Sequence, residues 1–571
     1  MDTMEKYYFW RERNLEDPAL TKELQDIVGD EEAINDRFYK DLEFGTGGLR
    51  GVLGAGTNRM NIYTVRRATQ GIAEWLKSQY KSSSVAIAYD SRNNSERFAK
   101  EAASVFAANG IKVYITPELM PTPFLSFLVR RKHCKSGVVI TASHNPAKYN
   151  GYKAYGSDGS QLGLADSEIV IGYINRLDFF SGIRTMPFEA ALKSNMIEYV
   201  SDSLVNEFLD AAQSQSIRPE VCKEADLSVV YTPLNGAGNK PVRAILSRMG
   251  IEKVTVVPSQ ENPDGNFPTC PYPNPEVREA LAEGLKLCET AKADLLLATD
   301  PDSDRVGIAV RCGEEYKLLT GNEVGALLTD YILAGRKEKG TLPDNPIVIK
   351  TIVTTGLIDR IAAQYGAQVV DVLTGFKFIG EQMTMLAEKK EENRYVFGFE
   401  ESYGYLAGTH ARDKDGVTAS MLVCEMASYY KLQGMTLCDA MEKLYQTHGY
   451  FLHPQDNFYF EGESGMKEMN RIMESLRKEP LQRIGGLRVV RRTDILRSES
   501  VNTLTGERTK VDLPSSNVLL YTLEDDEGVV VRPSGTEPKI KFYYTAVAGS
   551  RAEAEALLEH LRADMNALIG K

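Results

Sequence analysis

The sequence contains no long apolar run, no paired cysteine motif and no excess of basic residues. Its 7 cysteines are scattered without a CxxC pair, which argues against a disulfide framework and a structural zinc site and fits a reducing cytoplasm. No apolar run reaches membrane-spanning length, and the first residues, MDTMEKYYFW, do not resemble a signal peptide. The formal net charge of −12 argues against nucleic acid or an anionic membrane as partner, because both require a basic surface.

The length and composition are those of a folded protein with several domains. A chain of 571 residues is too long for one hydrophobic core, and about four domains of roughly 150 residues each are expected. Apolar residues make up 43% and charged residues 26%, which is ordinary for a globular protein and argues against disorder.

One pattern, a strand, a helix and a second strand, occurs three times along the chain. A Gly follows each helix, and an early Pro begins the second one, as helix ends often require. Such βαβ units predict α/β domains with mixed, mostly parallel sheets. The segments are 85–90, 94–109 and 111–115; 227–232, a helix through Pro241 to Gly250, and 253–257; and 347–352, 356–365 and 367–372.

The C-terminal part departs from this pattern. Close-spaced apolar runs at 518–524, 528–532 and 539–547 are typical of an antiparallel sheet. The last helix places six apolar residues on one face: Leu557, Leu558, Leu561, Met565, Leu568 and Ile569. We therefore expect three similar α/β domains and a C-terminal α+β domain, with boundaries at 1–208, 209–318, 319–445 and 446–571.

Each repeat also carries a third apolar run that ends in an unusual polar loop. The three segments read GVVITASHNP (137–146), DLLLATDPDSDR (294–305) and YVFGFEESYG (395–404). Ligands of such sheets gather at the carboxyl ends of the strands, so the three loops are expected to contribute to one site.

Ser143 is the candidate nucleophile of the first loop. Ser, Asn and Pro are also common turn residues, so a plain turn is the alternative. A serine hydrolase is disfavoured, because GxSxG is absent and the adjacent His144 is poorly placed to act as its base. With Lys148 and Lys153 nearby in sequence, the hydroxyl is better suited to accept a phosphoryl group.

The second loop, DPDSDR, is a candidate metal site. Asp300, Asp302 and Asp304 alternate behind an apolar strand, and hard oxygen ligands of this kind suit Mg²⁺. An EF-hand is excluded, because Arg305 stands where that loop needs a glycine. A solvated acidic turn is less favoured, because three neighbouring carboxylates repel one another without a compensating cation.

Four more segments carry polar residues that are candidates for the same cleft. Glu400 and Ser402 in GFEESYGY could bond sugar hydroxyls. RPSGTEPK combines a guanidinium, hydroxyls and backbone N–H groups, which suits a phosphate dianion. FGTGGLRG (44–51) with Arg50 and LTGFKFIG (373–380) with Lys377 are glycine-rich and could also be plain loops.

Together, TASHNP, DPDSDR, GFEES and RPSGTEP resemble the α-D-phosphohexomutase family in order and in distribution, one in each expected domain. The resemblance spans nearly the whole chain and implies four domains around a central cleft. It further implies a phosphoserine at Ser143, Mg²⁺ held by that phosphate and the three aspartates, and a substrate phosphate held by the RPSGTEP loop. The other residues that match family positions are Arg50, His144 and Lys153 near the phosphoserine, with His144 or Lys153 in proton transfer; Thr374, Gly375, Glu400, Ser402 and Lys414 for the sugar; Arg532, Ser534, Gly535 and Thr536 for its phosphate; and Arg305 and Lys377 as neighbours.

Within the family, FGTGGLRG, GFEESYGYL and the N-terminal FWRERNLEDPALTKEL look like the long-chain bacterial phosphoglucomutases, a branch shared with phosphopentomutases. The resemblance implies interconversion of glucose 1-phosphate and glucose 6-phosphate through glucose 1,6-bisphosphate in a cytoplasmic monomer or homodimer. Pentose or mannose phosphates as substrates, a phosphatase that passes the phosphoryl group to water, and a non-catalytic phosphosugar sensor stay open as alternatives.

Overall fold

The computed structural model describes residues 1–571 apart from residues 46, 461, 535–538 and 570–571. The chain divides into two units, residues 1–321 with 376–436, and residues 322–375 with 437–571. No helix among the residues described is both long and apolar enough to cross a membrane.

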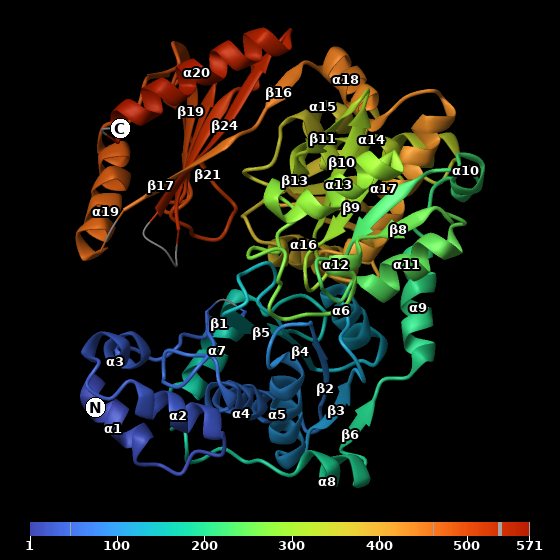
Figure 1. The fold of residues 1–571 in the computed structure, drawn as a ribbon. Helices are drawn as coiled ribbons and strands as arrows, with labels where there is room; N and C mark the ends of the chain where they lie inside the picture. Colours follow the sequence, from blue (N-terminus) through green and yellow to red (C-terminus); the bar gives the residue numbers. More distant parts are fainter. Residues whose placement is uncertain (46, 461, 535–538, 570–571) are drawn as a thin grey trace. The chain divides into compact units, whose positions relative to one another are not determined.

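The first unit begins with three short helices and a six-stranded α/β sheet. The strand order is β1-β5-β4-β2-β3-β6. Strands β4, β2, β3 and β6 are parallel to one another, β5 pairs antiparallel with β4, and β1 pairs antiparallel with β5. The elements are α1 (Thr3–Arg11), α2 (Pro18–Asp26), α3 (Glu31–Phe38), β1 (Gly48–Val52), α4 (Ile62–Gln79), β2 (Ser84–Tyr89), α5 (Ser95–Ala108), β3 (Lys112–Ile115), α6 (Thr122–Arg131), β4 (Ser136–Ile140), β5 (Tyr149–Tyr155), α7 (Leu164–Ile174), α8 (Phe188–Lys193) and β6 (Ile197–Tyr199) (Figure 1).

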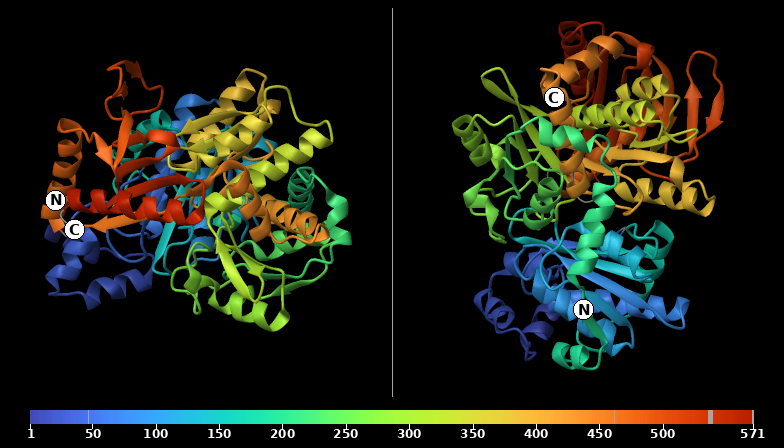
Figure 2. Two further views of the ribbon diagram at one scale, coloured as in Figure 1. Left: turned by 90° about the horizontal axis from the view of Figure 1, so that it is seen from above. Right: turned by 90° about the vertical axis from the view of Figure 1, so that its right-hand side faces the viewer.

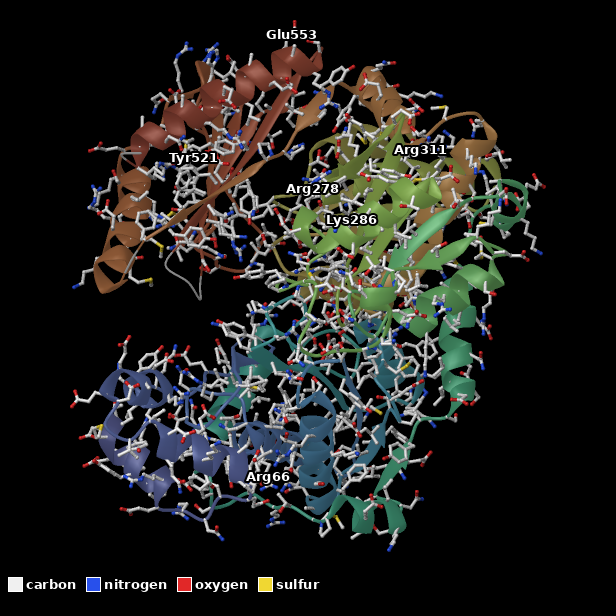
Figure 3. All side chains as sticks on the ribbon, viewed as in Figure 1. Arg66, Arg278, Lys286, Arg311, Tyr521 and Glu553 are labelled. Carbon is white, nitrogen blue, oxygen red and sulfur yellow. The ribbon has the colours of Figure 1, made fainter. Side chains whose placement is uncertain are left out.

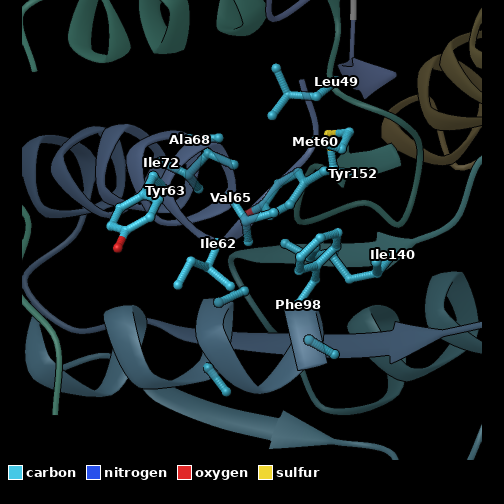
Figure 4. Packing of buried hydrophobic residues seen from close by; sticks show 14 of the residues in the cluster. Leu49, Met60, Ile62, Tyr63, Val65, Ala68, Ile72, Phe98, Ile140 and Tyr152 are labelled. Atoms are coloured by element: carbon cyan, nitrogen blue, oxygen red, sulfur yellow. The ribbon is translucent and has the colours of Figure 1, made fainter. Parts of the chain in front are cut away.

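The apolar core of this part joins the N-terminal helices to the sheet. Val65 and Ile72 lie seven residues apart on one face of α4 and pack in one cluster with Phe98 of α5 and Ile140 of β4 (Figure 4). Trp10 of α1 belongs to the same cluster and is 1% exposed. The N-terminal extension is therefore part of the first domain's core.

A second sheet follows in the same unit, in the order β11-β10-β9-β7-β8. Strands β9, β7 and β8 are parallel to one another, β10 pairs antiparallel with β9, and β11 pairs antiparallel with β10. The elements are α9 (Asp202–Gln213), α10 (Pro219–Glu224), β7 (Val229–Thr232), α11 (Asn239–Arg248), β8 (Val254–Val256), α12 (Pro258–Glu261), η1 (Arg278–Leu281), α13 (Ala282–Ala291), β9 (Leu295–Thr299), β10 (Val306–Cys312) and β11 (Glu315–Leu319).

The rest of the first unit comprises α16 (Phe376–Glu388), η2 (Glu392–Arg394), the antiparallel hairpin of β14 (Tyr395–Glu400) and β15 (Gly404–Ala407), and α17 (Gly416–Leu432). Asp415 caps α17 by accepting hydrogen bonds from the N–H groups of Val417 and Thr418. Helix α17 is buried along most of its length, so its position fixes the loop before it, which carries Lys414.

The second unit contains a parallel strand pair and a large antiparallel sheet. The pair is β12 (Ile347–Thr351) and β13 (Gln368–Val372), connected by α15 (Leu357–Gln364), and α14 (Gly321–Glu338) precedes it. The antiparallel sheet has the order β16-β24-β23-β22-β19-β20-β21, with β17 on β24 and β18 on β19. Its elements are α18 (Leu437–His448), β16 (Tyr450–Leu452), β17 (Gln455–Tyr459), α19 (Gly462–Lys478), β18 (Arg483–Ile484), β19 (Leu487–Asp494), β20 (Glu499–Asn502), β21 (Arg508–Lys510), β22 (Leu519–Leu523), η3 (Glu524–Asp526), β23 (Gly528–Pro533), β24 (Lys539–Ala548) and α20 (Arg551–Leu568).

Helix α20 packs against this antiparallel sheet (Figure 2). Leu561 and Met565 of α20 are buried in one cluster with Tyr521 of β22, which is labelled in Figure 3. The predicted apolar face of the helix is confirmed for these residues and for Leu558, but Leu568 is 41% exposed. That expectation was wrong for Leu568, which is the last residue of the helix.

Candidate active site

The candidate site of the first unit forms where strands end. Strand β4 leads to Ser143, β9 leads to Asp300, and β14 ends at Glu400. In each case a buried strand fixes the backbone at the point where a polar side chain follows. The expectation that these three loops follow strand ends is confirmed.

Ser143 is buried and lies against the aspartate loop. Its Oγ donates a hydrogen bond to Oδ2 of Asp300 at 2.7 Å and lies 3.2 Å from Nδ1 of His144. The side chain is 3% exposed, and the backbone adopts a left-handed φ of 50°. Such a φ in a residue with a Cβ costs about 1–3 kcal/mol and persists only where surrounding bonds enforce it. A plain turn at the surface does not account for this burial and strain.

The three aspartates form a buried cluster. Asp300, Asp302 and Asp304 are 0%, 0% and 1% exposed, and each offers an oxygen within 4.8 Å of the others. Oδ1 of Asp302 and Oδ1 of Asp304 are buried without a hydrogen-bond partner in the described chain. Unpaired carboxylate oxygens of this kind fit a hard divalent cation. A solvated acidic turn is excluded by the burial.

The charges within this cluster are strongly unbalanced. Burial, together with repulsion from Asp302 and Asp304, raises the pKa of Asp300 well above its ordinary value. A bound cation would remove this repulsion. The aspartate loop is otherwise well supported, because Oδ1 of Asp300 accepts the N–H groups of Asp304 and Arg305, and Thr122 Oγ1 donates to Oδ2 of Asp302 at 2.8 Å.

Two lysines lie against the same carboxylates. Nζ of Lys153 is 2.7 Å from Oδ2 of Asp302 and 3.1 Å from Oδ2 of Asp304, and Nζ of Lys414 is 3.2 Å from the latter atom. Burial alone would lower the pKa of both lysines, but the neighbouring carboxylates outweigh it and raise the pKa of each. Both side chains are therefore ammonium ions at neutral pH.

His144 has the opposite protonation state. Burial, reinforced by the guanidinium groups of Arg305 and Arg50, lowers the pKa of His144 well below its ordinary value. The imidazole is therefore neutral at physiological pH and able to accept a proton, which neither neighbouring lysine can do.

A cavity of about 230 Å³ connects the groups of the site. It brings together the predicted residues Arg50, Ser143, Lys153, Asp304, Arg305 and Lys414. The remaining lining residues are Gly47, Gly48, Leu49, Thr141, Tyr152 and Gln161. Arg50 donates to Oδ1 of Asn145 at 3.2 Å, which ties β1 to the serine loop.

Sequence reasoning missed two residues at this site, Asp413 and Gln161. Asp413 is buried and accepts hydrogen bonds from Tyr155 Oη at 2.7 Å, Gln161 Nε2 at 3.1 Å and Lys414 Nζ at 3.1 Å, so it holds Lys414 in place. Its position in RDKDG beside Lys414 was the available signal. Nothing in the sequence pointed to Gln161.

Other predicted residues have different surroundings. Glu400 is 5% exposed, and its charge helps to raise the pKa of Lys414. Ser402 is half-buried after β14. Lys377 is half-buried in the first turn of α16, where burial lowers its pKa. The segments 44–51 and 373–380 are not plain loops, because they include β1 and the start of α16 respectively.

The remaining predicted residues belong to the second unit. Thr374 and Gly375 follow β13, and Thr374 Oγ1 is buried without a partner in the described residues. Arg532 is half-buried on β23, and the Ser534 N–H donates to the Lys539 carbonyl at 2.8 Å. Gly535 and Thr536 lie outside the described residues.

Comparison with known proteins gives consistent matches. Models of phosphoglucomutase/phosphomannomutase alpha/beta/alpha domains I, II and III match residues 41–180, 206–313 and 320–448. Phosphoglucomutases of Staphylococcus saprophyticus and Staphylococcus aureus are each 35% identical; the matches cover 92% of this chain and 94% of the first relative, and 95% of this chain and 95% of the second.

A solved structure shows the same fold. The open form of pp63/parafusin, a phosphoglucomutase from Paramecium, aligns with a TM-score of 0.70 at 18% identity, over 94% of this chain and 97% of that one. The extent of the sequence matches and the agreement in fold show that the chain belongs to the phosphoglucomutase/phosphomannomutase family.

Proposed function

We propose that the protein interconverts glucose 1-phosphate and glucose 6-phosphate through a phosphoserine enzyme and a bound glucose 1,6-bisphosphate. One observation carries the proposal most directly: the hydroxyl of Ser143 lies 2.7 Å from a buried cluster of three aspartates with unpaired oxygens. The naming of curated relatives as phosphoglucomutases supports glucose as the sugar.

The reaction proceeds in two transfers. In the first, the free hydroxyl of the hexose phosphate gives its proton to a base of the site and its oxygen bonds to phosphorus, while the bond between phosphorus and Ser143 Oγ breaks and Oγ takes up a proton. The resulting bisphosphate then turns around. In the second transfer, Ser143 Oγ loses its proton and bonds to the phosphorus of the sugar's other phosphoryl group, while the bond from that phosphorus to the sugar oxygen breaks and this oxygen takes up a proton. The step restores the phosphoserine and leaves the isomeric monophosphate.

Asp300, Asp302 and Asp304 are the residues that would hold Mg²⁺, together with the serine phosphate. Mg²⁺ bound there would offset negative charge on the phosphoryl group during transfer. Lys153 and Lys414, both ammonium ions beside the cluster, add positive charge for the phosphoryl oxygens. His144 is neutral whereas Lys153 is an ammonium ion, so His144 is the better candidate for the proton acceptor.

The rest of the substrate would be bound by the other predicted residues. Arg532, Ser534, Gly535 and Thr536 are assigned to the phosphate that is not in transfer, since a guanidinium fork, hydroxyls and backbone N–H groups suit a dianion. Glu400 and Ser402, with Thr374 and Gly375, are assigned to the sugar hydroxyls. Arg50, Arg305 and Lys377 are assigned to the surroundings of the transferred phosphate.

A small phosphosugar is the only partner that the reaction requires. We assign glucose 1,6-bisphosphate the role of intermediate and activator, because it can phosphorylate Ser143 from either end. A monomer or homodimer in the cytoplasm is our expectation.

The proposed function is tested by two products measured in one reaction. With glucose 1-phosphate and Mg²⁺, we expect glucose 6-phosphate to accumulate with little free phosphate. Free phosphate as the main product would instead indicate the phosphatase, and binding without either product would indicate the sensor. A panel of glucose, mannose, glucosamine and ribose 1-phosphates separates the candidate sugars.

A further inference from the structure

A second group of buried residues lies behind the nucleophile. Arg92, in the loop between β2 and α5, is 3% exposed, and Asp90 at the end of β2 is 2% exposed. The Nε atom of Arg92 lies 3.5 Å from Oδ2 of Asp90, and the Arg92 N–H donates to Oδ1 of Asp90 at 3.0 Å. Neither residue lines the cavity of the site.

The guanidinium of Arg92 binds the backbone of the serine loop. Its Nη1 donates to the carbonyls of Pro146 at 3.1 Å and Tyr149 at 3.2 Å. Its Nη2 donates to the carbonyls of Ser143 and Asn145. One planar cation thus satisfies four carbonyls of a single loop, which the compact ammonium of a lysine cannot do.

The backbone N–H of Ser143 is connected through Thr141 to Asp90, the partner of Arg92. The Ser143 N–H donates to Thr141 Oγ1 at 2.8 Å, and Thr141 Oγ1 donates to Oδ2 of Asp90 at 2.6 Å. Both the N–H and the carbonyl of Ser143 therefore depend on Asp90 and Arg92. This arrangement accounts for the left-handed φ of 50° at Ser143, which needs such enforcement.

We propose that Arg92, with Asp90 and Thr141, is a positioning residue that fixes the backbone of the nucleophilic serine for both phosphoryl transfers. The inference rests on the proposed function. The serine must donate and regain a phosphoryl group in the same geometry within one turnover. A displacement of about 1 Å in a reacting group can cost about 100-fold in rate, so the loop must be rigid.

Arg92→Lys tests this role, because it keeps the charge and removes the fork. We expect kcat to fall about 100-fold while KM changes by less than about threefold. Without substrate, backbone amide hydrogen exchange in peptides covering 141–149 should rise in the variant. The matched control is Arg97→Lys in α5, which alters a surface ion pair with Asp17 and should leave kcat and exchange unchanged.

A second pair of variants covers the case in which Arg92→Lys does not fold. Thr141→Val keeps the side-chain shape but leaves the Ser143 N–H unpaired, whereas Thr141→Ser keeps the hydroxyl. Because only Thr141→Ser can still hold the Ser143 N–H, it should retain at least about tenfold more activity than Thr141→Val.

Two results would overturn the proposal: an Arg92→Lys variant with unchanged kcat or unchanged loop exchange, or equal activity of the two Thr141 variants. Wild-type protein without mutase activity would instead reject the proposed function, and the exchange measurement would still report on the loop.

Discussion

At the scale of single residues, the sequence indicated candidate site residues but not the contacts that support them. Ser143 and the three aspartates follow strands, and short motifs with polar residues at strand ends are visible without a structure. Asp90, Arg92 and Asp413 act through hydrogen bonds to residues far along the chain. Such long-range contacts leave no local pattern at Asp90 or Arg92, and the one local signal for Asp413 was its position beside Lys414.

The metal assignment predicts a large effect of a single atom change. Asp302→Asn replaces one anionic oxygen, and we expect turnover to fall at least about 100-fold, because metal stabilisation of a transferred phosphoryl group is worth several kcal/mol. Initial rates across a Mg²⁺ titration measure the effect. The control is Glu314→Gln, whose side chain is 97% exposed. Full wild-type activity in EDTA would reject the assignment.

A half-buried histidine in the second unit, His453, predicts a pH effect on stability. Burial, with Lys350 nearby, lowers the pKa of His453 to about 3, and its Nε2 is buried without a partner in the described chain. The folded protein therefore keeps this imidazole neutral, while the unfolded chain binds a proton below about pH 6.5. Stability from this group is present above pH 6.5 and is lost as the pH falls toward 3.

His453→Gln should remove that dependence. At pH 5 the wild-type protein loses up to about 2 kcal/mol through His453 relative to pH 7. The thermal midpoint should therefore fall less between pH 7 and pH 5 in the variant than in the wild type. The exposed His560→Gln serves as the control. If the thermal midpoint fell equally in the wild type and in His453→Gln, the lowered pKa of His453 would be contradicted.

At the scale of elements, the strand–helix–strand repeats and the antiparallel C-terminal strands were predicted well. Periodicity and Gly or Pro punctuation are local signals, and the corresponding strands appear within a few residues of their predicted positions. Strand β1 was not predicted, because the glycines of its segment also suit a loop. Residues 48–52 form this edge strand, whose pairing with β5 depends on contacts about 100 residues away.

The β1–β5 pairing predicts a sensitive glycine. A Cβ at Gly48 would lie 2.0 Å from the carbonyl oxygen of Tyr152 on β5. Gly48→Ala should therefore separate the strands that carry Arg50 and Lys153, lowering both the thermal midpoint and kcat. Gly110→Ala has open space and should cost only about 1 kcal/mol from its left-handed backbone. Equal stability of the two variants would contradict the pairing.

At the scale of the whole molecule, the fold class followed from the strand–helix–strand repeats, and the family resemblance followed from the order of four motifs. The comparisons confirm the family and fold. The domain boundaries stay predictions, and those at residues 208 and 445 fall inside helices α9 and α18. Boundaries of this kind depend on packing between domains, which a single sequence does not reveal.

Substrate choice is a property of the assembled protein, and we expect glucose phosphates to be preferred over mannose phosphates. The Glu400 carboxylate and the Ser402 hydroxyl could form hydrogen bonds with neighbouring equatorial hydroxyls of glucose. The 2-hydroxyl of mannose is axial and would lose such a bond. One unpaired buried group costs about 1–3 kcal/mol, or about one to two decades in kcat/KM. Glu400→Ala should therefore reduce the ratio of kcat/KM for glucose 1-phosphate to that for mannose 1-phosphate. The exposed control variant Glu388→Ala should leave this ratio unchanged. Equal use of both sugars by the wild type would contradict this assignment.

The central claim is that Ser143 carries the phosphoryl group. Peptide mass spectrometry of the protein after incubation with glucose 1,6-bisphosphate and Mg²⁺ tests it directly, with Ser143→Ala treated in parallel. The account predicts one phosphate on the peptide that contains Ser143, assigned to that residue, and neither phosphate nor isomerisation in the variant. Phosphate on another residue, or normal turnover by Ser143→Ala, would contradict it.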